Sequence, residues 1–320
     1  MTPAPVTSEL LTVLICSYNH AQYLPAAMES ILSQSVLPEQ ILLLDDGSTD
    51  HTADIAATYA DKVAYHKLPH GGLVAARNKG LELVQTEWFA ILDADNLFDP
   101  GYLEIMDRVI RNHGEDSRFA MAIPSRRYFG FTNAFREIPE FSPALLRNRN
   151  IVDANSVYRT SAAREVGYDP GMLTLEDHDH GISLVRAGYQ CRSVPDAVLA
   201  YRTHSTSVSA MHRSLGTRRK MRKRLLAKHR EWFSDEEAAT FEAKTRKQHL
   251  FGLIYSRTPA SSWISRLRSV IAFAVESVRH GEFIWQGFYW LFPQQYFTRR
   301  VEPAEVFYLY KDTPVRREQL

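Results

Sequence analysis

Cysteine is scarce in this sequence, which has only Cys16 and Cys191 among its 320 residues. Cys16 lies inside an apolar strand pattern and Cys191 follows a helical pattern, so we expect two reduced, structural thiols and no disulfide framework. Long apolar runs are also absent, because no stretch reaches the roughly 20 residues of a membrane-spanning helix. The first residues lack the basic and apolar segments of a signal peptide. We therefore expect a cytoplasmic protein.

Two nucleotide-binding signatures are missing as well. The sequence contains neither GxGxxG nor GxxxxGK[ST], which argues against a dinucleotide-dependent dehydrogenase and against a P-loop protein. The small net charge of +1 hides a strong asymmetry, since residues 1–205 hold 17 Lys and Arg against 26 Asp and Glu, whereas residues 206–320 hold 21 against 11. The two halves therefore face different partners or face each other.

Apolar runs and helical patterns alternate along the first hundred residues. Strands are predicted at 11–18, 41–44, 63–68 and 87–95, and helices at 20–34, 51–60 and 71–85. Such alternation is typical of an α/β domain with a parallel sheet and helices on both faces. Ligands of such sheets bind at the carboxyl ends of the strands.

Two adjacent carboxylates, Asp45 and Asp46, follow the second predicted strand. A turn with a helix cap explains Ser48 to Asp50 but leaves this pair unexplained. At a strand end the pair would reach the ligand crevice, with Gly47 allowing close backbone approach. A carboxylate accepts hydrogen bonds from ribose hydroxyls and from a ring N–H, which uracil, thymine and guanine offer. The pair therefore favours a nucleotide with one of these bases.

The fourth predicted strand ends in a second acidic element, Asp93-Ala94-Asp95. Two carboxylates one residue apart can hold Mg²⁺ or Mn²⁺ against two phosphates, directly or through water. Solvated acidic turns are common, so this motif alone is weak evidence for a metal site. The acidic turn at the end of the second predicted strand makes a metal site more plausible.

Six segments in this order resemble the landmarks of the inverting family 2 glycosyltransferases, which have the GT-A fold. The resemblance spans about residues 10–209. The segments are SYN (17–19), DDGSTD (45–50), GGLVAARNKG (71–80), LDADN (92–96), LEDHDHGISLVRAGYQ (175–190) and YRTHSTSVS (201–209).

The resemblance implies a nucleotide-sugar donor site with a divalent cation, Mn²⁺ or Mg²⁺. By it Asp46 would contact the base, Tyr18 would line the base pocket, and Arg77 would contact the nucleotide. Asp95 would bind the metal under the diphosphate, and His204 would be a further metal or diphosphate contact. The other explanation for His204 is a surface histidine in a loop. The remaining residues that it assigns to the donor site are Ser17, Asp45, Asp93 and Ala94.

An inverting transfer also needs a base that takes the proton of the acceptor hydroxyl. Asp177, in the cluster 176–180, would be this base, and neighbouring carboxylates would raise its affinity for a proton. The other explanation is helix capping, because acids at a helix N-terminus interact well with the helix dipole. For Glu176, Asp179, His178 and His180 we prefer such structural roles.

These observations predict a non-processive enzyme, since the QxxRW sequence and spanning helices of processive synthases are absent. The donor would be a UDP-sugar, or a dTDP- or GDP-sugar, and the acceptor a carbohydrate or a lipid-linked molecule in polysaccharide, lipopolysaccharide or glycoconjugate synthesis. The alternative is a catalytically silent relative that binds a nucleotide sugar or recruits partners. Two departures from the family pattern, GYDP at 167–170 and His180, concern the acceptor side.

The predicted catalytic domain covers residues 1–210, with the donor site in 10–100 and the acceptor side and base in 101–210. We expect residues 211–320 to form a basic, amphipathic helical region, since 213–230 hold nine Lys and Arg and no acid. Its apolar stripe at 263–278 and its aromatic segment at 281–297 could pack on protein, form a homo-oligomer or contact the inner face of a membrane. No nucleic-acid module accompanies the basic run, so we expect no nucleic-acid partner.

Overall fold

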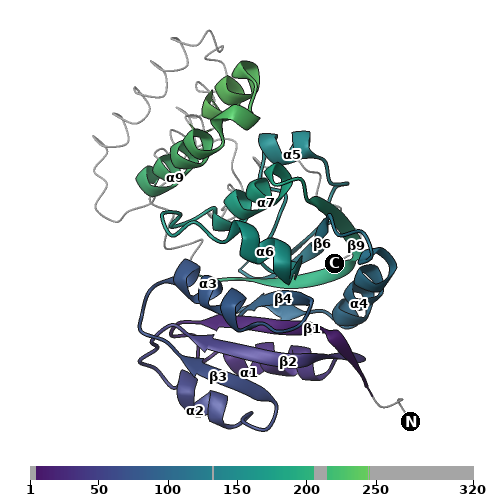
Figure 1. Ribbon diagram of the computed structural model, residues 1–320. Helices are drawn as coiled ribbons and strands as arrows, with labels where there is room; N and C mark the ends of the chain where they lie inside the picture. Colours follow the sequence, from purple (N-terminus) through teal and green to yellow (C-terminus); the bar gives the residue numbers. More distant parts are fainter. Residues whose placement is uncertain (1–4, 132, 205–214, 244, 246–320) are drawn as a thin grey trace, which may run out of the picture. The chain divides into compact units, whose positions relative to one another are not determined.

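The computed structural model describes residues 5–131, 133–204, 215–243 and 245 (Figure 1). The chain divides into two compact units, Met1–Ser205 with Val315–Leu320, and Thr206–Pro314. We call them unit 1 and unit 2. This division lies close to the predicted boundary at residue 210. Every described residue of the candidate site belongs to unit 1.

The first part of unit 1 alternates strands and helices, as the sequence pattern predicts. Strand β1 lies between β2 and β4, β3 lies outside β2, and all four strands are parallel. The elements are β1 (Val6–Ser17), α1 (Leu24–Leu32), β2 (Val36–Asp45), α2 (Thr52–Ala57), β3 (Val63–Lys67), α3 (Leu73–Leu83) and β4 (Trp88–Asp93).

The second part of unit 1 extends the same sheet. The strand order is β3-β2-β1-β4-β8-β6-β9-β5, with β7 paired to β6. Strand β8 is antiparallel to β4 and β6, whereas β6 and β9 are parallel. The sheet is thus mixed, and the predicted parallel arrangement holds for β1 to β4 and for β6 with β9. The added elements are β5 (Leu97–Phe98), α4 (Tyr102–His113), β6 (Phe119–Gly130), β7 (Ala134–Arg136), α5 (Pro143–Asn148), β8 (Val157–Arg159), α6 (Thr160–Val166), α7 (Glu176–Arg186) and β9 (Gln190–Thr203).

Helices cover both faces of the sheet, because its central strands are apolar on both sides. Residues 11, 13 and 15 of β1 pack in one core cluster with Met28 of α1 and Met106 of α4. Leu14 points to the other face, where a Cβ at Gly80 of α3 would lie 2.4 Å from its Cδ2 atom. Only a glycine allows α3 to approach the strand this closely.

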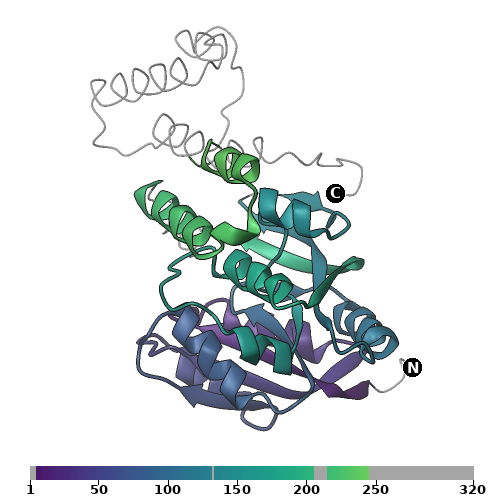
Figure 2. The same ribbon diagram turned by 45° about the horizontal axis from the view of Figure 1, so that its top comes forward.

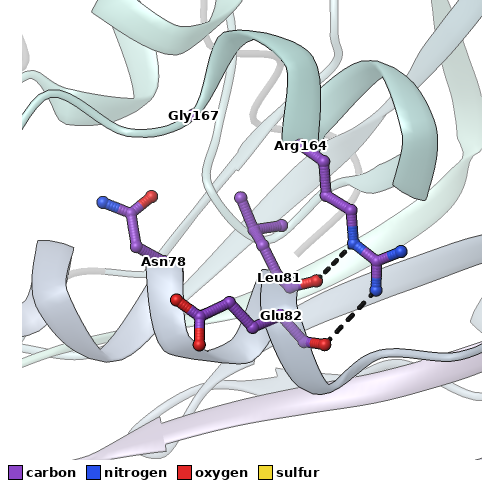
Figure 3. A pocket seen from close by; sticks show the side chains of 5 residues that line it. All are labelled: Asn78, Leu81, Glu82, Arg164 and Gly167. Carbon is purple, nitrogen blue, oxygen red and sulfur yellow. Dashed lines mark hydrogen bonds between the residues drawn. The ribbon is translucent and has the colours of Figure 1, made fainter.

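Helix α6 is fastened to the C-terminal end of α3, and the two helices lie side by side in Figures 1 and 2. The Arg164 Nε atom donates to the Leu81 carbonyl oxygen over 2.6 Å, and the same guanidinium reaches the Glu82 carbonyl (Figure 3). Carbonyl groups at a helix end lack intrahelical partners, so this arginine satisfies them.

Asn78 of α3 holds the chain that leads from α6 to α7. Its Nδ2 atom donates to the Tyr168 carbonyl oxygen over 2.9 Å, and its Oδ1 atom accepts from the Tyr168 amide over 2.9 Å. This double hydrogen bond fixes the segment that precedes α7. The position of α7 relative to the parallel strands is therefore set partly by α3.

The described part of unit 2 is helical, with α9 (Leu215–Lys228) followed by the short helix η1 (Arg230–Trp232). Met221, Leu225 and Phe241 are buried within it. The predicted apolar stripe at 263–278 and the aromatic segment at 281–297 lie outside the described residues. None of the helices described in this chain has the length and apolar character needed to cross a membrane.

Candidate functional site

The carboxyl ends of β1, β2 and β4 meet at one edge of the sheet, which we call the site edge. In the strand register Ser17 of β1 lies opposite Asp45 of β2, and Cys16 lies opposite Asp93 of β4. The sequence places its two acidic turns directly after β2 and at the end of β4. The parallel register therefore brings these turns together beside the SYN segment. The Ser17 hydroxyl is buried there, without a hydrogen-bond partner in the described part of the chain.

Asp45 is fully buried, and both of its carboxylate oxygens have protein donors. Oδ1 accepts from the Ser48 amide over 2.7 Å, and Oδ2 accepts from the Tyr65 hydroxyl over 2.6 Å. These bonds close the turn after β2 and attach it to β3. The geometry favours a structural role for Asp45, so its predicted contact with a nucleotide remains a prediction.

Asp46 binds the loop between β3 and α3. Its Oδ1 atom accepts from the Gly71 amide over 2.8 Å, and its Oδ2 atom accepts from the Gly72 amide over 2.9 Å. The His70 Nδ1 atom lies 2.9 Å from both the main-chain oxygen and Oδ2 of Asp46. A carboxylate offers about four lone-pair positions, so Asp46 keeps capacity for a further donor.

A pair of stacked rings lies beside Asp46. The rings of Tyr18 and His70 are 4.2 Å apart at 21°, and Tyr18 is 41% exposed. Gly47 has a φ of 77°, and a Cβ there would lie 2.9 Å from the His70 amide nitrogen. The DDG turn thus supports His70 directly. The sequence reasoning identified Tyr18 but missed His70, whose position depends on this packing.

Two non-glycine residues of the described chain have a left-handed backbone, one beside Tyr18 at the site edge and the other directly before α7. They are Asn19, with a φ of 53°, and Leu175, with a φ of 65°. Such conformations cost energy and cluster at functional sites. Asn19 follows Tyr18 and joins two loops, since its amide donates to the Ser48 hydroxyl and its Oδ1 atom accepts from the Thr49 amide, each over 2.9 Å.

Asp93 lies at the end of β4 between a cation and an amide. Its Oδ1 atom is 3.0 Å from Arg77 Nη2, and its Oδ2 atom accepts from Asn155 Nδ2 over 2.9 Å. Burial raises the pKa of Asp93, and Arg77 partly opposes this effect. The Ala94 side chain is buried in the hydrophobic core, so a contact of this residue with a nucleotide sugar would use its main chain.

The structure brings together the two predicted metal ligands, Asp95 and His204. His204 Nε2 lies 2.9 Å from Asp95 Oδ2, and both side chains are largely buried. No group of three or more His, Cys, Asp or Glu residues suited to a metal ion occurs among the residues that the structure describes. Mg²⁺ and Mn²⁺ at nucleotide sites use few protein ligands, with phosphates and water completing the shell. The oxygen and imidazole donors of this pair fit such an ion.

Arg77 is almost completely buried, with 1% of its surface exposed. Its guanidinium lies between Asp93 and Glu176, and the Nη1 to Glu176 Oε1 distance is 2.6 Å. Burial lowers the pKa of Arg77, but Asp93 and Glu176 outweigh burial and hold it above its ordinary value. Arg77 therefore joins β4 to the start of α7. In this arrangement it lies beneath the site edge, and its predicted contact with a nucleotide remains a prediction.

Asp177 lies in the first turn of α7. Its Oδ1 atom accepts from the His178 amide over 2.7 Å, and its Oδ2 atom accepts from Asn150 Nδ2 over 3.0 Å. Burial raises the pKa of Asp177 to about 7, with further contributions from Glu176 and Asp153. A carboxyl group with such a pKa is both a functional-site candidate and an effective proton acceptor near neutral pH.

The other members of the 176–180 cluster are engaged with protein. His178 Nε2 lies 2.8 Å from the Leu146 carbonyl oxygen, and His180 Nδ1 lies 3.0 Å from the Gly167 carbonyl oxygen. Both histidines and Asp179 are buried. These contacts agree with the structural roles that the sequence reasoning preferred for them.

A buried polar residue that the sequence reasoning missed, Asn155, connects Asp93 of the DAD turn with Asp153. Its Nδ2 atom donates to Asp93 Oδ2 and to Asp153 Oδ1, each over 2.9 Å, and its Oδ1 atom accepts from the Asp93 amide over 2.7 Å. Asp153 in turn pairs with Arg126 over 2.9 Å. In the sequence, the only signal for Asn155 was the group of polar residues in VDANS (152–156), directly before a buried strand.

Residues 12–165 match the sequence profile of a family described as glycosyl transferase family 2. This segment belongs to that family. The match covers the donor-side turns and ends before α7, so it does not include Asp177 or His204.

Similar proteins agree with this assignment. An uncharacterized glycosyltransferase of Rickettsia typhi is 36% identical over 97 residues, which are 30% of each chain. The chain spans 28–31% of the length of this relative and of three other curated relatives that it matches.

Two solved structures share the fold. S. aureus TarS in complex with UDP-GlcNAc has a TM-score of 0.57 at 16% identity, covering 81% of this chain and 79% of TarS. The mannosyltransferase PcManGT of Pyrobaculum calidifontis, in complex with GDP-Man and Mn²⁺, has a TM-score of 0.55 at 13% identity, covering 84% of this chain and 80% of that one. The predicted GT-A fold is confirmed.

Proposed function

We propose that this chain is an inverting glycosyltransferase that moves a single sugar from a UDP-sugar to an acceptor hydroxyl. The observation that carries the proposal is the link from the end of β4 to the start of α7 through Arg77. This link ties the DAD turn to the first turn of α7, which carries the high-pKa carboxyl of Asp177. The membership of residues 12–165 in family 2 supports the assignment.

The donor nucleotide would bind over β1 and β2. Tyr18 offers a partly exposed ring for stacking on a base, and Asp46 offers a carboxylate for a ring N–H or a ribose hydroxyl. The UDP-GlcNAc complex of TarS favours a uridine donor, whereas the GDP-Man complex of PcManGT keeps guanosine as the second candidate.

Asp95 and His204 would hold a Mg²⁺ or Mn²⁺ ion, which would supply positive charge to the departing diphosphate. The protein contributes to the same step by fixing the DAD turn. Asn155 and Arg77 each bind Asp93, so the turn is held from two directions. A turn that does not move during the reaction stabilises the leaving group without a reorganisation cost.

Asp177 would accept the proton of the acceptor hydroxyl while that oxygen forms the new bond to the anomeric carbon and the bond to the diphosphate breaks. Asn150 and the His178 amide hold the two carboxylate oxygens, which fixes the direction of the lone pairs. A pKa of about 7 suits this task, because an ordinary carboxylate is a much weaker base.

The acceptor would be a carbohydrate or a lipid-linked molecule in polysaccharide, lipopolysaccharide or glycoconjugate synthesis. The basic composition of residues 211–320 supports a location at the inner face of a membrane, where a lipid-linked acceptor is found. A homo-oligomer formed through the same residues is the competing role for this region.

A donor panel tests the proposal. The full chain is incubated with Mn²⁺, with UDP-, dTDP- or GDP-sugars and with candidate acceptors, and the products are identified by mass spectrometry. We expect transfer or slow hydrolysis with a UDP-sugar. Binding of UDP without turnover of any donor would favour the silent-relative alternative, and absence of nucleotide binding would reject both.

A further inference from the structure

Arg202, near the end of β9, is attached to the DAD turn. Its Nε atom donates to the Asp95 carbonyl oxygen over 2.9 Å, and its main-chain amide donates to Asn96 Oδ1 over 2.9 Å. The neighbouring residue His204 lies on the Asp95 carboxylate. Both Arg202 and His204 therefore contact Asp95 of the DAD turn.

Two aromatic rings keep the Arg202 guanidinium in place. Its Cζ atom lies 5.0 Å from the Tyr23 ring centre and 4.4 Å from the Phe129 ring centre. Tyr23 also contacts His204, with ring centres 4.8 Å apart. Cation–π contacts of this kind hold a planar guanidinium without using its terminal nitrogens. The side chain is therefore pre-organised before any ligand arrives.

The charge of Arg202 has no acidic partner among the described residues. Four other partly or fully buried arginines of unit 1 pair with carboxylates: Arg77 with Asp93 and Glu176, Arg126 with Asp153, Arg127 with Asp99 and Arg159 with Glu87. In the described part of the chain, Arg202 makes contacts only through Nε, its main chain and its two aromatic neighbours. Its terminal nitrogens thus remain available to an anion.

We propose that Arg202 binds the diphosphate of the nucleotide sugar, beside the ion that Asp95 and His204 would hold. This inference rests on the proposed donor and adds a residue to its site. A diphosphate presents several oxygens in a row, and a guanidinium donates two parallel hydrogen bonds to such a group. Because Arg202 carries its charge without a metal, it supplies the part of diphosphate binding that survives removal of the divalent ion.

The test compares UDP with uridine, which has the same base and ribose but no phosphate. Calorimetry gives the UDP affinity and ligand-observed NMR the uridine binding, both with EDTA and with Mn²⁺, on the full chain. The variants are Arg202→Gln and Arg202→Lys. Arg127→Gln is the matched control, since Arg127 also lies over the Phe129 ring but pairs with Asp99.

We expect Arg202→Gln to weaken UDP binding about tenfold or more in EDTA, and to leave uridine binding unchanged. Arg202→Lys keeps the charge but loses the planar fork, so it should retain part of the UDP affinity. The control should match the wild type with both ligands. Thermal melting of each variant shows whether the fold is intact.

Two results would overturn the inference. Equal losses of UDP and uridine affinity would show that Arg202 only supports the turn, and unchanged UDP affinity in both variants would show that the diphosphate does not reach it. Failure of the wild type to bind UDP at all is a different result, because it rejects the proposed function itself.

Discussion

Replacing Asp177 by Asn separates catalysis from stability at one position. The variant keeps the size of the side chain and removes the acceptor for the hydroxyl proton. If Asp177 is the base, the transfer rate at pH 8 should fall by roughly 10² to 10⁴. UDP affinity should not change, because the donor-side groups Asp46, Asp95 and His204 are untouched. Calorimetry and a product assay measure the two quantities separately.

The effect of the same substitution on stability follows from the pKa of about 7, which lies above the ordinary value of 3.8. The folded protein binds a proton here more tightly than the unfolded chain, so the ionised group opposes folding increasingly as pH rises from about 4 to 7. Above pH 7 the ionised group lowers the free energy of unfolding by at most about 4 kcal/mol. An asparagine carries no charge, so it does not lower the free energy of unfolding in this way.

Asparagine also loses one contact. It has a single side-chain oxygen, so it can accept from the His178 amide or from Asn150 but not from both, which costs about 1 kcal/mol. The variant should therefore melt at a higher temperature than the wild type at pH 8, and this difference should vanish or reverse near pH 4. Asp61→Asn is the control, since Asp61 is exposed and forms no ion pair in the described part of the chain.

Helix capping alone predicts a different pattern. Asparagine is a good N-terminal capping residue, so both transfer and melting temperature would stay near their wild-type values at every pH. Near-wild-type transfer in Asp177→Asn would refute the assignment of the base. A melting-temperature difference that does not depend on pH would refute the raised pKa.

Three further predictions concern the donor turns, the buried network and the tail. Asp46→Ala should weaken UDP binding with and without Mn²⁺, whereas Asp95→Ala should remove mainly the Mn²⁺-dependent part of the affinity. Calorimetry measures both, with Asp54→Ala as the control. Wild-type UDP affinity in both variants would contradict the nucleotide site. Asn155→Ala removes one side-chain donor from each of the carboxylates of Asp93 and Asp153, so it should lower the unfolding free energy by about 2 kcal/mol and reduce UDP affinity. Denaturant unfolding checks this, and unchanged stability would speak against the network. Residues 211–320 should bind anionic liposomes at low salt and release them as ionic strength rises. A flotation assay tests this, with neutral liposomes as the control. No binding at low salt, together with an oligomer that is lost when residues 211–320 are deleted, would support packing on protein instead.

The sequence by itself determined the order of the elements and the placement of the acidic turns. Strands β1 to β4 and helices α1 to α3 follow from local apolar periodicity, which depends on residues only a few positions apart. A parallel sheet necessarily brings its strand ends to one edge, so the meeting of the turns after β2 and β4 was predictable too. Motif order added the candidate base and metal ligands.

Only the tertiary structure decided what each side chain at that edge contacts. Asp45 and Asp46 are neighbours in sequence, yet the first holds Tyr65 and the second holds the Gly71 and Gly72 amides. Arg77 is buried at the site edge because it pairs with Glu176, which lies on α7 and is far from Arg77 in the sequence. These contacts join residues that are 20 to 99 positions apart in the sequence. Local patterns carry no information about such distances, because they depend on how the whole sheet and its helices pack.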